Sequence, residues 1–221
     1  MTIIFLVTFI GLMGFGIILP LFPFYAERMG ASPEIITLTM AAFSLGQFVA
    51  APLWGRLSDS IGRKPVLILT LLGSSLSYVI LAYAPNLTVV ILSRILSGLM
   101  AGNVSIAFAY VTDITDDNNR AAGLGKVSAA LGLGFMTGPA IGGLLAGNTV
   151  ENANYLLTAW AAAGINFVAM VAAIVFLKES LDAKKRKPFE GFSKIVELAT
   201  FTPAKSILPL VSCGLIFYTA M

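Results

Sequence analysis

Arg94 is the residue whose type and position most directly indicate a chemical role, because it is a charged residue inside a long apolar stretch. It lies eight residues beyond Asn86, a depth of about 12 Å along a helix at 1.5 Å per residue. An arginine in a bilayer costs roughly 2.5–3.5 kcal/mol, so water, carbonyl groups or a carboxylate must compensate it. Two interpretations stay open. The side chain either extends to the outer membrane edge or forms a buried charge beside a transport pathway.

A short charged island from Gly55 to Pro65 is the second candidate, because it holds Asp59, Arg63 and Lys64 together between two uncharged runs. Each run is about long enough to cross a bilayer core of roughly 30 Å. The island is therefore expected to be a tight turn at one membrane face. Gly62 can take the positive φ that such a turn requires, and Pro65 suits the first turn of the next helix.

Several kinds of site are excluded by residue type. The sequence contains no histidine and one cysteine, which excludes a histidine metal site, an internal disulfide and a cysteine cluster. It contains no nucleophile–base pair and no phosphate-binding loop, so neither an enzyme nor a cofactor is expected. The short basic run near residue 185 lies next to an apolar span, which favours a linker near lipid head groups over a nucleic-acid site.

Composition identifies the elements that must position these residues. The chain of 221 residues is 57% hydrophobic and only 11% charged, with mean hydropathy +0.90, whereas a soluble domain has about 25% charged residues. An all-α, polytopic membrane protein follows. The first apolar run lacks a basic leader and is read as a span instead of a signal peptide. The six expected spans are Thr2–Phe24, Ile35–Trp54, Val66–Ala84, Leu87–Val111, Gly123–Gly147 and Tyr155–Leu177.

Basic residues fix the expected orientation, because loops rich in lysine and arginine stay in the cytoplasm. Arg28 alone lies on the opposite side, and Arg94 lies within a span. The N-terminus and the segment after the sixth span are therefore expected to be cytoplasmic. The other basic residues, all expected at the cytoplasmic face, are Arg56, Arg63, Lys64, Arg120, Lys126, Lys178, Lys184, Lys185, Arg186, Lys187, Lys194 and Lys205.

Small and polar residues inside the spans predict where helices meet. Gly134, Gly138 and Gly142 are four residues apart and share one helix face, which lets another backbone approach closely. Pro139 removes a helical hydrogen bond and should bend the fifth span. Polar groups in spans face other helices or water, so they are candidates for helix–helix contacts or for the lining of a cavity. These polar groups are Gln47, Tyr78, Asn103, Tyr110 and Asn166.

The island resembles the signature loop between the second and third helices of the major facilitator superfamily, G-x-L-a-D-r-x-G-r-k. Six positions match, whereas Ser58 and Ser60 depart from the pattern. The loss of a basic residue at Ser60 removes one ion pair that the family pattern implies. The matching positions are Gly55, Leu57, Asp59, Gly62, Arg63 and Lys64.

Three further stretches resemble motifs of the same family. Arg94 to Gly98 is similar to its fourth-helix R-x-x-q-G motif, with Ser97 at the glutamine position. Pro20 to Pro23 resembles the first-helix P-x-x-P pattern of the drug–proton antiporter branch. The stretch from Gly134 to Gly143, with Pro139, matches the g-x-x-x-G-P-x-x-G-G signature of the antiporter branches.

The resemblance implies the six-helix N-terminal half of a major facilitator fold. Residues 1–177 would form the bundle, 178–205 a cytoplasmic loop with a possible amphipathic helix, and 206–221 the truncated start of a seventh span. A C-terminal six-helix half would be missing from this chain. By the same resemblance, Asp113 would pair with Arg63 beside Asp59 to close the cytoplasmic face, and Arg94 would take part in proton coupling.

The expected function is secondary active transport, with proton-coupled efflux of drugs or small organic metabolites by alternating access. Its partners would be a small-molecule substrate, protons, the lipid bilayer of a plasma or inner membrane, and the missing half. No acidic residue lies in the middle of a span, so coupling would require the missing half or a pathway-facing Glu27. Two alternatives stay open: an uncoupled facilitator or importer, and a non-transporting receptor or scaffold.

Overall fold

The computed structural model describes residues 1–147, 153–186 and 188. Within those ranges every regular element is helical. Asn86, Asp116 and Asn154 each accept a hydrogen bond from a backbone N–H three residues on, so their side chains cap three helix starts. The elements are α1 (Thr2–Ile18), α2 (Phe22–Arg28), α3 (Pro33–Ile61), α4 (Arg63–Ala82), α5 (Leu87–Met100), α6 (Asn103–Ile114), α7 (Asp117–Ala146), α8 (Tyr155–Phe176) and the 3₁₀ turn Ala183–Lys185.

The prediction of six membrane spans is confirmed for the described residues, in which six helical stretches are long and apolar enough to cross a bilayer. Two of these spans are interrupted. The first breaks between α1 and α2, directly before Phe22 and Pro23. The fourth breaks between α5 and α6 at Ala101 and Gly102, which the sequence did not indicate.

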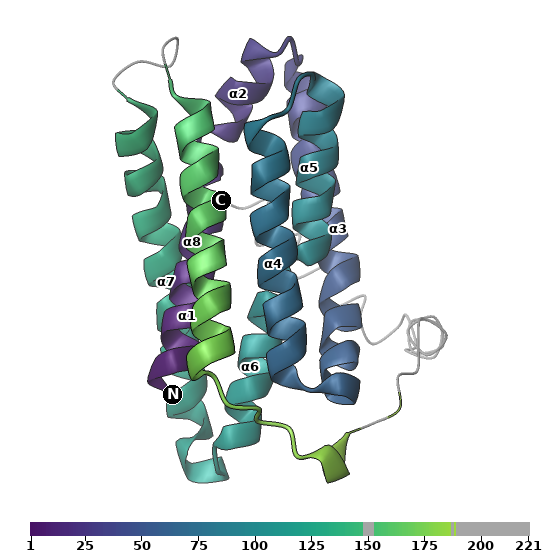
Figure 1. The fold of residues 1–221 in the computed structure, drawn as a ribbon, viewed down its shortest axis with the longest axis vertical. Helices are drawn as coiled ribbons and strands as arrows, with labels where there is room; N and C mark the ends of the chain where they lie inside the picture. The colour runs from purple at the N-terminus through teal and green to yellow at the C-terminus, as the bar shows by residue number, and fades with distance from the viewer. Residues whose placement is uncertain (148–152, 187, 189–221) are drawn as a thin grey trace, which may run out of the picture. The chain divides into compact units, whose positions relative to one another are not determined.

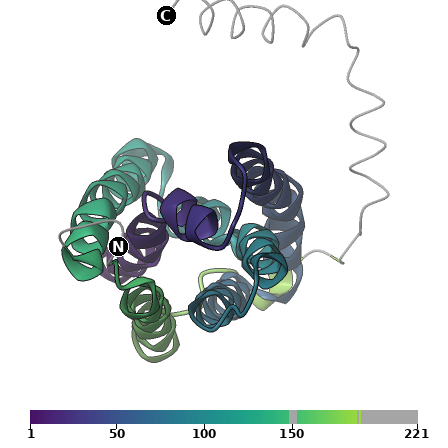
Figure 2. The same ribbon diagram turned by 90° about the horizontal axis from the view of Figure 1, so that it is seen from above.

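Six of the helices form two groups of three, one made of α1, α7 and α8 and the other of α3, α4 and α5. Within one group α1 packs along α7 and α8, within the other α3 and α4 pack on α5, and α4 also contacts α8. Seen from above, α2 lies across the upper end between the groups (Figure 2). The turns α3–α4 and α6–α7 lie at the lower end, together with the N-terminus and the end of α8 (Figure 1). We call this lower end the basic face.

Two apolar clusters hold the bundle together at its two ends. One joins the start of α1 to α4, α6, α7 and the end of α8 around Ile4, Leu67 and Ile106. The other joins the end of α1 to α2, α4, α5 and the start of α8 around Ile17 and Phe22. Between the clusters the walls of the bundle carry polar side chains, and the candidate site lies there.

The charged island differs from its predicted form. Helix α3 continues through Gly55 and Asp59 to Ile61, and Arg63 already begins α4. The turn therefore consists of Gly62 alone, with φ +115°, a conformation that glycine adopts without steric cost. The expected tight turn, with Gly62 at positive φ and Pro65 in the first turn of the next helix, is therefore present, but it is shorter than the island because Gly55 to Ile61 continue α3. Of the expected loop 178–205 the structure describes residues 178–186 and 188, and the expected segment 206–221 lies outside the described residues.

Candidate functional site

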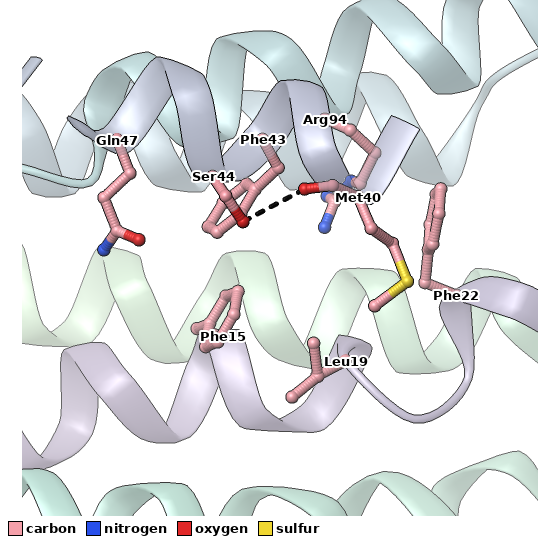
Figure 3. A pocket seen from close by; sticks show the side chains of 8 residues that line it. All are labelled: Phe15, Leu19, Phe22, Met40, Phe43, Ser44, Gln47 and Arg94. Atoms are coloured by element: carbon pink, nitrogen blue, oxygen red, sulfur yellow. Dashed lines mark hydrogen bonds between the residues drawn. The ribbon is translucent and has the colours of Figure 1, made fainter. Parts of the chain in front are cut away.

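A cavity of about 210 Å³ opens midway along the bundle between the two groups of helices. Figure 3 shows aromatic and apolar side chains from both sides, with one cationic side chain reaching in from α5. The cavity combines an apolar wall with three polar groups, as is typical of sites for small organic molecules. It is lined by Phe15, Leu19, Phe22, Met40, Phe43, Ser44, Gln47 and Arg94.

Helix α3 supplies half of this lining from one face. Met40, Phe43, Ser44 and Gln47 are spaced at i, i+3, i+4 and i+7, and so lie in one stripe of the helix. The sequence analysis singled out Gln47 but missed the other three. Their spacing was a usable signal, although an apolar stripe by itself does not distinguish a cavity wall from a helix contact.

Arg94 is 5% exposed, and its guanidinium points between α1 and α3 into the cavity (Figure 3). Its Cζ atom lies 5.6 Å from the centre of the Phe22 ring and 5.3 Å from that of Tyr78. Within the described part of the chain, neither Nε nor Nη2 has a hydrogen-bond acceptor. The arginine is therefore buried inside the bundle and held against aromatic faces, which favours the interpretation of a charge beside a pathway.

A smaller cavity of about 50 Å³ adjoins the first and shares Phe15, Phe43 and Gln47 with it. Tyr78, Asn103 and Asn166 also line it. Four of the five predicted polar residues are thus brought to one place. The fifth, Tyr110, lies elsewhere, since its hydroxyl donates a hydrogen bond to the Lys178 carbonyl. Glu27 is exposed on α2.

Arg63 forms a second site at the basic face, where each of its three side-chain nitrogens has an acceptor. Its Nε donates to Asp113 Oδ2 at 2.9 Å, its Nη1 donates to Ser58 Oγ at 2.7 Å, and its Nη2 lies 2.6 Å from Asp59 Oδ1. The structure thus joins α3, α4 and α6 through one side chain. Ser58, which departs from the family pattern, supplies one of these contacts.

Glu179 completes this cluster and was missed by the sequence analysis. Its carboxylate accepts hydrogen bonds from the backbone N–H groups of Arg63 at 2.8 Å and Lys64 at 3.1 Å. It thereby caps the start of α4, where a negative charge also meets the positive end of the helix dipole. The adjacent Ser180 donates to Asp113. These partners are separated by more than 100 residues from Arg63 and Lys64, and no local pattern indicates such a contact.

The glycine face of α7 contacts α1. A Cβ atom at Gly138 would lie 2.7 Å from the Gly16 Cα and the Met13 carbonyl oxygen. Gly134 and Gly142 likewise face α1 backbone, so larger residues at these three positions would separate the helices. Gly143 is different, since a Cβ there would meet no described atom within 4 Å. Gly55 also has open space, so neither of these two glycines is required by packing within the described residues.

Comparisons with known proteins agree with this architecture. The sequence matches the Major Facilitator Superfamily over residues 4–221. It is 35% identical over 187 residues to multidrug resistance protein 2 of Bacillus subtilis and 34% identical over 186 residues to the class C tetracycline resistance protein of Escherichia coli. These alignments cover 84% and 82% of this chain and 46% of each relative.

The crystal structure of the human organic anion transporter MFSD10 (TETRAN) has the same fold, with a TM-score of 0.76 and 28% identity. The match covers 89% of this chain and 52% of that chain. The chain therefore spans about half the length of the curated relatives it matches. From the family match over almost its whole length and the six apolar helices, this integral, multi-pass membrane protein belongs to the Major Facilitator Superfamily.

Proposed function

We propose that this chain forms one six-helix half of a secondary transporter that exports drugs or small organic metabolites. The observation that carries the proposal is the cavity between the two groups of helices, which combines aromatic walls with the buried guanidinium of Arg94. Secondary transporters typically bind substrate near the bilayer midplane, at an interface between structural repeats. Relatives named for multidrug, tetracycline and quinolone resistance support export as the direction.

The Arg63 cluster would act as the gate of this carrier. It ties α3, α4 and α6 to the segment after α8 at the basic face. When these contacts are formed, the cytoplasmic entrance is closed and the cavity would open outward. Contacts of this kind, which are partly exposed, contribute modestly, and modest energies suffice to shift an equilibrium between two states of similar free energy.

Close packing of α1 on α7 would keep the closed side free of leaks. Gly134, Gly138 and Gly142 allow the two backbones to touch, and Pro139 leaves α7 without one helical hydrogen bond at this contact. The pair can therefore move as a unit when the bundle rocks against a second six-helix half. Proton coupling would need a protonatable group in reach of Arg94, supplied by that second half.

Uncoupled facilitation or import is the second candidate, and one observation favours it. The spans contain no carboxylate near their middle, and Arg94 has no ion-pair partner among the described residues. A carrier without a membrane carboxylate could move its substrate down a gradient. The two candidates differ in whether transport follows the proton gradient.

Accumulation of tetracycline and a fluorescent quinolone in cells tests the proposal. Cells expressing the complete gene are compared with cells expressing Arg94→Ala or Asp59→Asn, each with and without a protonophore. Lower accumulation that is lost in both variants and abolished by the protonophore supports proton-driven export. Faster or higher accumulation than in cells without the protein, unaffected by the protonophore, supports the uncoupled candidate. Unchanged accumulation of a broad compound panel, with normal membrane expression, contradicts transport of this class.

A further inference from the structure

The groups that line the cavity around Arg94 also indicate which chemical class of ligand would bind there. Arg94 is the single charged group in its lining. Its Nε and Nη2 groups are buried and have no acceptor in the described residues. A buried donor without an acceptor is unfavourable, and the penalty is larger when the donor is charged. A ligand that brings an anionic acceptor to this position would therefore gain affinity that a neutral ligand would not.

The neighbours of the guanidinium limit how this acceptor can approach. Phe22 and Tyr78 cover the guanidinium at 5.6 and 5.3 Å from their ring centres, and both rings are buried. The planar fork of Arg94 remains directed toward the cavity between α1 and α3 (Figure 3). A planar guanidinium pairs with a carboxylate or a similar two-oxygen group through two parallel hydrogen bonds.

Two stacked phenylalanine rings in the lining indicate which kind of ligand skeleton would fit the cavity. Phe15 of α1 and Phe43 of α3 lie with their ring centres 5.1 Å apart and nearly parallel, at 16°, and both line the cavity beside Leu19 and Met40. A flat aromatic ring can extend this stack. A volume of about 210 Å³ is below the roughly 300 Å³ of ordinary ligand pockets, so a bicyclic acid or one end of a larger drug would fit.

We propose that this cavity binds organic anions in which a carboxylate is attached to a flat aromatic ring system, with Arg94 on the anion and Phe15 and Phe43 on the ring. The physiological meaning of this specificity rests on the proposed transport function, whereas the binding itself can be measured without transport. Gln47 on α3 would contact a further polar substituent of a larger ligand, because it lies at the end of the cavity away from Phe22 (Figure 3).

Binding to the purified complete protein in nanodiscs tests the proposal with three matched probes. Naphthoate has the anion and the ring, naphthamide has the ring without the charge, and cyclohexanecarboxylate has the charge without the aromatic ring. Calorimetric titration of the native protein should show naphthoate bound at least about tenfold more tightly than naphthamide, since loss of one partner of a buried charge pair has effects of this size or larger.

Variants assign the preference to residues. Arg94→Gln should abolish the advantage of naphthoate over naphthamide, and Arg94→Lys should keep part of it. Arg28→Gln is the matched control, because Arg28 is an exposed arginine on α2 that does not line the cavity, and it should leave the advantage unchanged. The double variant Phe15→Leu and Phe43→Leu should weaken naphthoate severalfold and leave cyclohexanecarboxylate unaffected.

Three outcomes would overturn the proposal: no binding of naphthoate at millimolar concentration, equal binding of acid and amide, or an advantage of the acid that survives Arg94→Gln. Equal binding would indicate that a carboxylate from another segment already neutralises Arg94, whereas an advantage that survives Arg94→Gln would indicate that another group binds the anion. Export from preloaded cells separates the two proposals. Arg94-dependent binding without export of any probe contradicts only the transport function, whereas export of acid and amide alike contradicts only the anion preference.

Discussion

Arg63 and Arg94 are buried to nearly the same extent, at 7% and 5% exposure, but their surroundings are opposite. Arg63 contacts two carboxylates and a serine hydroxyl, which satisfy all three of its side-chain nitrogens. Arg94 contacts two aromatic faces and leaves Nε and Nη2 without acceptors in the described residues. Burial alone therefore does not define the role of a membrane arginine.

We infer that Arg63 is a structural contact and that Arg94 is a binding group. An arginine whose side-chain nitrogens each have an acceptor stabilises the conformation in which its partners meet, and its removal leaves charges without partners. An arginine without acceptors is maintained at a cost in stability, and such a cost is typical of positions that interact with a ligand. Four substitutions, each measured by thermal and chemical unfolding of the purified complete protein, test this contrast.

Arg63→Met should have the largest effect. It removes three charge-assisted contacts and leaves Asp59 and Asp113 without a cation. The expected loss of stability is about 2–3 kcal/mol, because partial exposure of both carboxylates allows water to replace the arginine. The control is Arg28→Met, at an exposed arginine. A loss no larger than that of the control would show that the cluster does not stabilise this conformation.

Glu179→Ala should follow, with a loss of about 1–2 kcal/mol, since the carboxylate caps two backbone N–H groups at the start of α4. Glu179→Gln keeps an acceptor without the charge and should recover part of the loss. Hydrogen exchange of the first turn of α4 provides a local readout. Unchanged exchange there in Glu179→Ala would contradict the capping role. Glu27→Ala, at an exposed glutamate, is the control.

Ser58→Ala should cost about 1 kcal/mol, because Nη1 of Arg63 loses its acceptor at a fully buried position. Ser60→Ala, two residues away and only partly buried, is the matched control and should be nearly neutral. Equal effects of the two substitutions would mean that the Ser58 hydroxyl contributes nothing specific to the cluster.

Arg94→Met should have the smallest effect on stability and the opposite sign. It replaces an unsatisfied buried charge with an apolar side chain of similar length, so stability without ligand should be unchanged or increase by up to about 1 kcal/mol. Stabilisation by naphthoate should disappear in the same variant. A loss as large as that of Arg63→Met would remove the contrast and indicate that Arg94 has a permanent carboxylate partner.

Much of the fold follows from hydrophobicity along the chain. Six apolar stretches of sufficient length predict six helices, since a backbone in lipid must satisfy its hydrogen bonds internally. The extension of α3 to Ile61 and the break at Ala101 were not predicted, because polarity marks where a chain leaves the membrane and does not mark where its helix ends.

The sequence by itself determined the number of spans, the concentration of basic residues at one end and the presence of a charge at the level of the membrane. These depend on composition and on spacing within single helices. Only the tertiary structure decided that each side-chain nitrogen of Arg63 has an acceptor while two nitrogens of Arg94 have none among the described residues, that Glu179 caps α4, and that Met40 and Phe43 line a cavity together with Phe15. Each of these depends on which helix faces align across the bundle, and several crossing helices settle that alignment together.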